Sequence, residues 1–184
     1  MTFSFVSFPT IETERLVLRK AIERDAKDIL ELYSNENVVQ YMAIGPFTSV
    51  EDAKGEISWY EKIFLEQTGM RWVIEDKITQ KVIGTCGYLN YETEHKRIEI
   101  GYDLSPNAWG KGIMTEALKP IIHFAFHDMN MNKIEAEVTS ENVASLHLLS
   151  KLGFHKDGVL RQHEFEKGRY IDLAIYSLLK SEYK

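Results

Sequence analysis

A strand, a glycine turn and the start of a helix follow one another between positions 97 and 129. The strand-like run 97–104 leads into Trp109-Gly110-Lys111-Gly112, after which apolar residues recur at helical spacing. The first turn of a helix has unpaired backbone N–H groups and a partial positive charge, so it attracts anions. Glycine leaves no side chain between such an anion and the N–H groups. The stretch therefore predicts a cradle for a pyrophosphate group. The simpler alternative is a turn that only joins a strand to a helix.

Length and composition are typical of one globular domain. The chain has 184 residues, of which 44% are hydrophobic and 27% charged. We expect a single domain over 1–184, with its core from about 12 to 182. The net charge of -6 argues against a nucleic-acid partner held by a basic surface. The lone Cys86 allows no intrachain disulfide and is expected to be a buried core residue.

Signals for export or membrane insertion are not found. The apolar segment 1–9 is short and lacks a basic start and a small-residue cleavage site. No apolar run reaches the roughly 18 residues that a membrane span needs. We therefore expect a cytoplasmic protein without a membrane partner. The sequence does not determine the oligomeric state. One open alternative is a homo-oligomer in which the last strands pair with another subunit.

Periodicity predicts one mixed sheet with helices on both faces. Strands are expected at 15–20, 71–75, 81–89, 97–104, 133–138, 159–165 and 170–178. Helices are expected at 25–33, from 48 or 49 to about 67, from the glycine turn to about 129 with a kink at Pro120, and at 142–152. The order is β-α-α-β-β-β-α-β-α-β-β. It favours an α/β (α+β) domain with a mixed, mostly antiparallel sheet.

Several short motifs follow one another along the chain. They are Glu-Thr-Glu-Arg-Leu-Val-Leu-Arg (12–19), Ile-Glu-Ile-Gly-Tyr (98–102), Trp-Gly-Lys-Gly (109–112), Thr-Glu-Ala (115–117), Asn142 with Ser145, Lys-Leu-Gly-Phe (151–154), and Gly168-Arg169-Tyr170 with Asp172. In this order and spacing the chain resembles the GCN5-related N-acetyltransferase (GNAT) superfamily. Within it, the chain is most similar to the ribosomal-protein N-terminal acetyltransferases of the RimJ/RimL type.

The resemblance implies a GNAT-like fold and acetyl-CoA as the acetyl donor. It implies a primary amine as acceptor, such as the N-terminus of a ribosomal protein. It also implies cofactor contacts from the glycine turn, through Trp109, Gly110, Lys111, Gly112, Ile113, Met114 and Thr115. The family pattern of this turn is Gln/Arg-x-x-Gly-x-Gly/Ala. Trp109 at its first position is compatible with binding, because the turn offers its backbone N–H groups and not a side chain. Met114 at its last position is bulkier than Gly or Ala, which leaves the affinity for the cofactor open.

Acetyl transfer to an amine needs a base, an oxyanion donor and a partner for the leaving thiolate. Glu99, on the strand before the turn, matches the strand glutamate that is the base in some members of the family, and we expect it to act through water. The alternative is a structural carboxylate that pairs with Arg97 or a neighbouring strand. From the resemblance, the oxyanion donor is expected among the backbone N–H groups of Tyr102, Asp103 and Leu104.

Asn142 and Ser145 begin a helix and lie one turn apart on the same side. Asn142 matches the asparagine that contacts the pantetheine arm in the family, and asparagine is also among the best helix N-caps. Many relatives carry a tyrosine further along this helix as proton donor, but Leu149 stands there in this chain. Ser145 is therefore the candidate for hydrogen bonding to the thiolate. Its alternative is an ordinary first-turn serine.

Acceptor specificity is expected in the segments 41–47 and 163–172, which flank the acceptor groove in relatives. The expected wall consists of Tyr41, Met42, Phe47 and Tyr170, with Glu164 and Asp172 attracting a cationic amine. The alternative is that the aromatic residues only cover the sheet. No metal site is predicted, because His123 and His127 have no third ligand in the pattern.

Three other functions stay open or are disfavoured. The acceptor is alternatively a small amine, such as a polyamine, an amino sugar or an amino acid. A non-catalytic acetyl-CoA-binding module is a second alternative. A nicotinamide dinucleotide enzyme is disfavoured, because the turn lacks a third glycine and follows a meander. Since no nucleophile is evident, transfer is expected to be direct.

Overall fold

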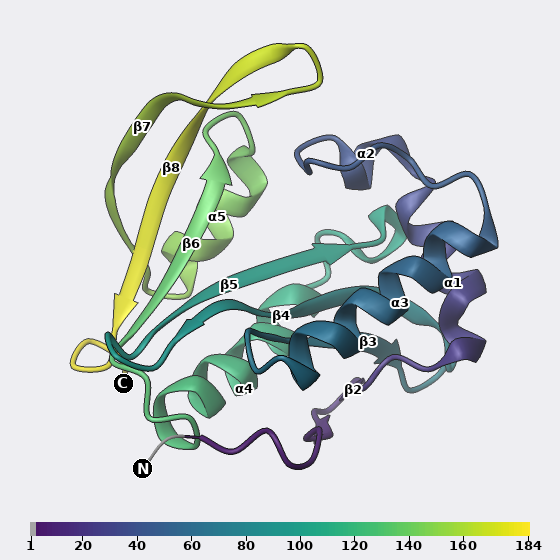
Figure 1. The fold of residues 1–184 in the computed structure, drawn as a ribbon, viewed down its shortest axis with the longest axis horizontal. Helices are drawn as coiled ribbons and strands as arrows, with labels where there is room; N and C mark the ends of the chain where they lie inside the picture. Colours follow the sequence, from purple (N-terminus) through teal and green to yellow (C-terminus); the bar gives the residue numbers. More distant parts are fainter. Residues whose placement is uncertain (1–2) are drawn as a thin grey trace.

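Residues 3–184 are described by the computed structural model, whose ribbon is shown in Figure 1. Met1 and Thr2, the start of the apolar N-terminal segment, lie outside the described residues. The strands are β1 (Ile11–Glu12), β2 (Leu16–Arg19), β3 (Met70–Asp76), β4 (Val82–Glu92), β5 (Arg97–Leu104), β6 (Lys133–Thr139), β7 (His155–Glu166) and β8 (Arg169–Leu179). The helices are α1 (Ala26–Tyr33), α2 (Glu36–Val39), α3 (Val50–Leu65), α4 (Ile113–His127) and α5 (Val143–Lys151).

The strands form one sheet in the order β1-β2-β3-β4-β5-β6-β8-β7. Neighbouring strands are antiparallel except β5 and β6, which are parallel. Their pairing joins only Arg97–Glu99 to Lys133–Glu135, so the rest of each strand has no partner on its inner edge. In Figure 1 the two strands spread apart from a shared point near the C-terminus. The sheet is therefore split in its middle.

Helices cover both faces of the sheet. On one face, α1 and α3 pack Ile29 and Tyr60 against Val73 of β3. On the other, α4 and α5 pack Leu118 and Leu149 against the second side of the strands. Figure 1 shows α3 in front of β3 and β4, with α4 behind them. Apart from the short β1 and α2, the elements follow the predicted order, and the predicted α/β fold with a mixed sheet is confirmed.

The helix starts have distinct local causes. Ser49 caps α3, since its hydroxyl accepts from the Asp52 N–H while the Asp52 carboxylate accepts from the Ser49 N–H. Gly112 begins α4 in the left-handed region and supplies no side-chain cap. Pro120, where a kink is expected, lies inside this helix, which is continuous from Ile113 to His127. The first turn of α4 therefore has free N–H groups.

Besides the short β1, the sequence did not predict α2 or the true start of β7. The helix α2 is only four residues long, with Asn35 as its N-cap, so it shows no periodicity. The strand β7 begins at His155, four positions before the predicted start. Most of its side chains are exposed, so it lacks the apolar alternation that marks a half-buried strand.

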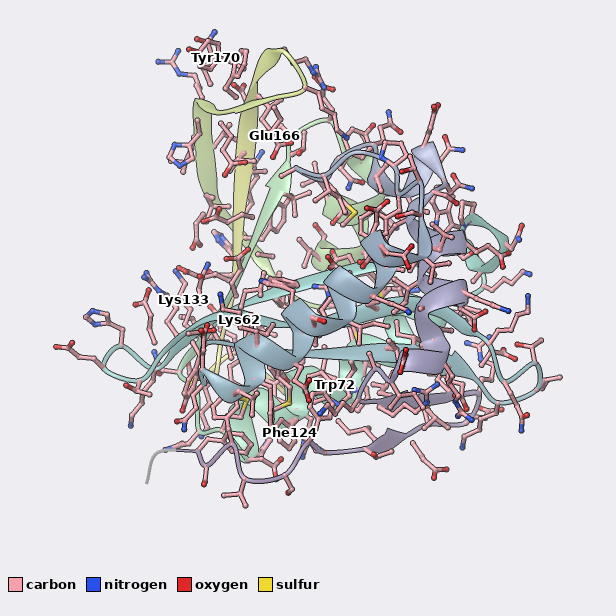
Figure 2. All side chains as sticks on the ribbon, turned by 45° about the vertical axis from the view of Figure 1, so that its right-hand side comes forward. Lys62, Trp72, Phe124, Lys133, Glu166 and Tyr170 are labelled. Carbon is pink, nitrogen blue, oxygen red and sulfur yellow. The ribbon has the colours of Figure 1, made fainter. Side chains whose placement is uncertain are left out.

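An aromatic cluster ties the N-terminal segment to the body. Phe8 packs edge-to-face on Trp72 of β3, and Phe3 packs on Phe124 of α4. Figure 2 labels Trp72 and Phe124 in this region, far from Tyr170 at the end of the β7–β8 hairpin. Among residues 3–184, no helix has the length and hydropathy to cross a membrane.

Candidate active site

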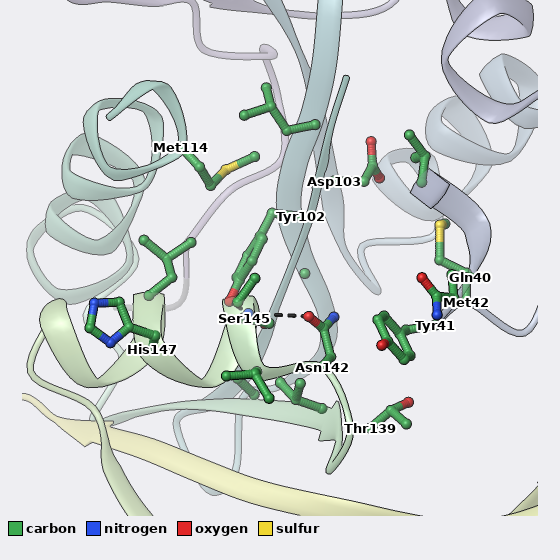
Figure 3. Close-up of a pocket in the computed structure, with 18 of the residues that line it drawn as sticks. Gln40, Tyr41, Met42, Tyr102, Asp103, Met114, Thr139, Asn142, Ser145 and His147 are labelled. Carbon is green, nitrogen blue, oxygen red and sulfur yellow. Dashed lines mark hydrogen bonds between the residues drawn. The ribbon is translucent and has the colours of Figure 1, made fainter. Parts of the chain in front are cut away.

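A pocket of about 1000 Å³ lies where β5 and β6 separate (Figure 3). Its walls come from β5, the glycine turn, the ends of β6 and α5, the α2 region and the β7–β8 hairpin. Of the residues expected from the sequence, it is lined by Glu99, Tyr102, Asp103, Leu104, Trp109, Gly110, Gly112, Ile113, Met114, Thr115, Asn142, Ser145, Tyr41, Met42 and Glu164. Residues far apart in the chain thus meet at the split of the sheet.

The glycine turn has the geometry of an anion cradle. Gly110 and Gly112 have φ angles of 71° and 73°, a region that disfavours other residues. A side chain at Gly110 would meet nothing within 4 Å, so the space beside the turn is open. The N–H groups of the first turn, from Ile113 to Thr115, have no acceptor within the helix. These groups fit a pyrophosphate.

An ion pair holds this turn against the sheet. Arg15 Nε lies 2.6 Å from Glu116 Oε2, and Arg15 Nη1 donates to the Lys111 carbonyl at 3.0 Å. Thr13 Oγ1 donates to Glu116 Oε1 at 2.6 Å. The sequence motifs at 12–19 and 115–117 are thereby joined, which sequence reasoning did not foresee. The Lys111 side chain does not line the pocket; its Nζ donates to the Asn107 carbonyl.

Glu99 lies on the pocket wall among other acids. Asn90 Nδ2 donates a hydrogen bond to Glu99 Oε2 at 2.6 Å. Burial raises the pKa of Glu99, and the neighbouring carboxylates of Glu137, Glu135 and Glu164 raise it further, while the Asn90 bond lowers it. A carboxylate with a raised pKa is suited to accept a proton near neutral pH.

Arg97 does not pair with Glu99. Its guanidinium pairs with Glu92 at 2.8 Å and with Glu135 at 3.2 Å. Of the two structural alternatives for Glu99, the ion pair with Arg97 is therefore wrong. The contact with a neighbouring strand is present, through Asn90 of β4.

Tyr102 and Ser145 meet across the pocket. The Tyr102 hydroxyl and Ser145 Oγ are 2.7 Å apart, and the Ser145 N–H donates to Asn142 Oδ1 at 3.2 Å (Figure 3). Asn142 is thus the N-cap of α5. Burial raises the pKa of Tyr102 to about 12. The sequence pointed to the backbone of Tyr102 and not to its phenol, because the partner on α5 is 43 positions away.

The side chain of Asp103 belongs to a buried polar network. Its Oδ2 accepts hydrogen bonds from the Tyr33 hydroxyl at 2.8 Å, from Thr85 Oγ1 at 2.9 Å and from Arg71 Nη2 at 2.7 Å. Asp103 is 8% exposed and Arg71 is 7% exposed. Sequence reasoning missed this network, since its members come from α1, β3, β4 and β5.

Carboxylates gather at the end of the pocket away from the glycine turn. Glu99 and Glu164 are joined there by Glu137 and Glu166, neither of which was singled out in the sequence. Burial raises the pKa of Glu166, with Glu164 as a further cause. Figure 3 shows Tyr41 and Met42 beside Gln40, on the side of the pocket away from Met114. This end of the pocket is suited to a cationic group.

Two expected wall residues, Phe47 and Tyr170, do not line the pocket, and neither does Asp172, which was expected to attract the amine. Phe47 packs against Tyr33 in the core beside α1, with ring centroids 5.1 Å apart. Tyr170 is 64% exposed at the hairpin and packs on Phe165 instead. The Asp172 carboxylate accepts a hydrogen bond from the Gln162 N–H at 2.7 Å. This bond lies where the pairing of β7 with β8 shifts register.

The expectation about metals concerns His123 and His127. Their rings stack with centroids 4.1 Å apart on α4. Among residues 3–184, no group of three or more His, Cys, Asp or Glu side chains is placed to hold a metal ion.

Comparison with known proteins places the chain in a family. The model of the acetyltransferase (GNAT) domain matches residues 15–155. An N-acetyltransferase of uncharacterised function from Bacillus licheniformis, p20, is 45% identical over 174 residues, covering 95% of this chain and 98% of that protein.

Solved structures of known enzymes share the fold. The spermidine N-acetyltransferase of Vibrio cholerae, in complex with CoA and spermine, has a TM-score of 0.80 at 27% identity. The alignment covers 93% of this chain and 99% of that protein chain. The ribosomal-protein-S5-alanine acetyltransferase of Vibrio fischeri has a TM-score of 0.81 at 24% identity. The alignment covers 96% of this chain and 99% of that protein chain. The chain therefore belongs to the GNAT family: it is an N-acetyltransferase, and acetyl-CoA is its acetyl donor.

Proposed function

We propose that the enzyme transfers the acetyl group directly to a primary amine, and that the acceptor is a protein N-terminus, such as that of a ribosomal protein. The observation that carries the proposal is the position of Glu99. It is the last residue of β5 that pairs with β6, at the point where the sheet splits, and it has a raised pKa and acidic neighbours. A base at this place meets an amine that enters from the acidic end of the pocket.

Different residues along the pocket bind the donor, stabilise the oxyanion and remove the proton. The first-turn N–H groups of α4 and the open space at Gly110 hold the pyrophosphate of the donor. Asn142 contacts its pantetheine arm, and backbone N–H groups between Tyr102 and Leu104 stabilise the oxyanion. Glu99, through water, removes a proton from the acceptor ammonium. Acetyl-CoA supplies the activated acetyl group, and no acyl-enzyme forms.

A free strand edge supports a peptide acceptor. Beyond Glu135, β6 no longer pairs with β5, although it runs on to Thr139. An unpaired strand edge binds an extended chain through backbone hydrogen bonds, and this edge is separate from the β5 N–H groups assigned to the oxyanion. The α-ammonium of a peptide bound in this way carries the single positive charge that the acidic end attracts. The relative from Vibrio fischeri is named for an alanine of ribosomal protein S5.

A polyamine is the second candidate acceptor. Glu137, Glu164 and Glu166 supply more negative charge at the acidic end than one ammonium needs. A chain with several ammonium groups would pair with more of them. The relative from Vibrio cholerae is named for spermidine.

Mass spectrometry with labelled acetyl-CoA tests both acceptors. One pool holds ribosomal-protein N-terminal peptides and the other holds polyamines, amino sugars and amino acids, with Glu99→Gln as the control in each. Label on peptide α-amines, lost in Glu99→Gln, supports the protein acceptor and the base. Label on polyamines alone overturns the peptide acceptor and keeps the chemistry. Bound acetyl-CoA without transfer to either pool contradicts the proposal.

A further inference from the structure

We propose that Tyr102 and Ser145 act as one proton-donating pair for the thiolate that leaves during transfer, and that Tyr102 is the source of the proton. This inference rests on the proposed transfer chemistry and adds a role that Ser145 alone does not fill. Both side chains line the pocket, and their hydroxyl oxygens lie 2.7 Å apart.

The pair is held in place from two sides. Ser145 is in the first turn of α5, and its N–H donates to the N-cap oxygen of Asn142. Tyr102 reaches it from β5, whose backbone is paired with β4 at Cys86. Two regular elements therefore fix the contact, as Figure 3 shows. Fixed hydroxyl groups donate to a developing charge with little reorganisation.

The phenol is the group of the pair that holds and supplies a proton. Its pKa lies at about 12, raised by burial, so it is protonated throughout the working range of an amine acetyltransferase. The nearest candidate on the same helix is His147, which is exposed and two positions from Ser145, so the two side chains do not face each other. Cys86 is buried, and burial raises the pKa of its thiol to about 12.

Protons and electron pairs are conserved in the transfer. The acceptor nitrogen forms a bond to the acetyl carbon, the carbon–sulfur bond breaks, and the sulfur keeps the electron pair. Ser145 donates its hydroxyl proton to the sulfur and takes the Tyr102 proton in the same event. Tyr102 then regains a proton from solvent. The acceptor ammonium loses two protons through Glu99, so one proton is released per transfer.

The test separates this role from simple binding. In Tyr102→Phe and Ser145→Ala, kcat is expected to fall about 100-fold, with the KM for acetyl-CoA unchanged within twofold. The double variant is expected to match the single variants, because the two groups act as a unit. Tyr183→Phe is the matched control, since Tyr183 is half-buried against Phe126 and outside the pocket.

A binding measurement without an acceptor provides an independent readout. Calorimetry compares CoA with desulfo-CoA at a pH above about 9, where the free thiol is ionised. The wild-type enzyme and Tyr183→Phe should prefer CoA by about tenfold, and the preference should disappear in Tyr102→Phe and Ser145→Ala.

The outcomes separate this proposal from the function itself. A kcat within twofold of wild type in Tyr102→Phe, or an unchanged preference for CoA in that variant, overturns the pair. If the wild-type enzyme acetylates no amine, the proposed function fails, while the CoA preference still decides whether the pair donates to the sulfur. Thermal unfolding of each variant shows that it is folded, and Ser145→Ala tests the pair if Tyr102→Phe is not.

Discussion

Lys167, in the turn between β7 and β8, donates a hydrogen bond from Nζ to the backbone carbonyl of Val39 at 2.6 Å. The two residues are 128 positions apart, and the same ammonium group lies 3.2 Å from the Gln40 carbonyl. In Figure 1 the end of the hairpin bends toward the region of α2. Gln40 and Glu166, on either side of this contact, both line the pocket. The contact therefore joins two walls of its acceptor end.

Lys167→Met should loosen the acceptor end without affecting the donor end. We expect the KM for the acceptor to rise about fivefold, since a lost hydrogen bond of about 1 kcal/mol changes a binding constant by that factor. The KM for acetyl-CoA should stay unchanged. Steady-state kinetics with each substrate varied in turn measures both. Lys156→Met, an exposed position on β7, is the control; an equal rise there would mean that loss of surface charge is the cause.

Asn90→Gly should move the acidic limb of the pH–rate profile to higher pH. The Asn90 bond stabilises the charged form of Glu99 and lowers its pKa, so its loss raises that pKa further. Glu99 accepts a proton only when ionised, and activity therefore falls as the pH drops through its pKa. Glycine is chosen because Asn90 has a φ of 50°. The measurement is kcat/KM from pH 5 to 9.

Glu99→Gln is the companion variant for that profile. It should lose about 100-fold in kcat/KM near neutral pH and should lack the acidic limb that Asn90→Gly displaces. A profile in Asn90→Gly that overlays the wild type, or an acidic limb that survives in Glu99→Gln, would assign the limb to another group.

The sequence predicted what depends on local pattern and missed what depends on register. The strand 97–104 and the glycine turn follow from periodicity, and both lie where expected. The Asp103–Arg71 pair spans 32 positions, and it forms only because β3, β4 and β5 align their residues side by side. No spacing within one segment reports such a contact. For the same reason, the phenol of Tyr102 was read only as part of a strand.

Arg71→Met should destabilise the protein strongly. Arg71 and Asp103 form a buried pair at 2.7 Å, and removing one partner leaves a charge in the interior. We expect a loss of about 3 kcal/mol in the free energy of unfolding. The double variant Arg71→Met, Asp103→Leu should lose less than Arg71→Met alone, because no unpaired charge remains. Urea unfolding of the single and double variants measures the difference. A double variant less stable than both single variants would mean that packing and not charge dominates here.

Met114→Ala should reveal whether this side chain serves the core or crowds the donor. Met114 is 7% exposed and belongs to the core cluster under α4, although it also lines the pocket. Truncation of a buried methionine costs about 2–5 kcal/mol of stability. We expect a loss in that range with the affinity for acetyl-CoA unchanged within twofold. Met131→Ala is the matched control, since Met131 is 2% exposed in the same cluster and does not line the pocket. A gain in acetyl-CoA affinity in Met114→Ala that is absent in Met131→Ala would mean that the methionine restricts the cradle. Because the Met114 side chain packs between α4 and the sheet, its bulk fills the core beside the turn, and the N–H groups of the turn stay free to bind.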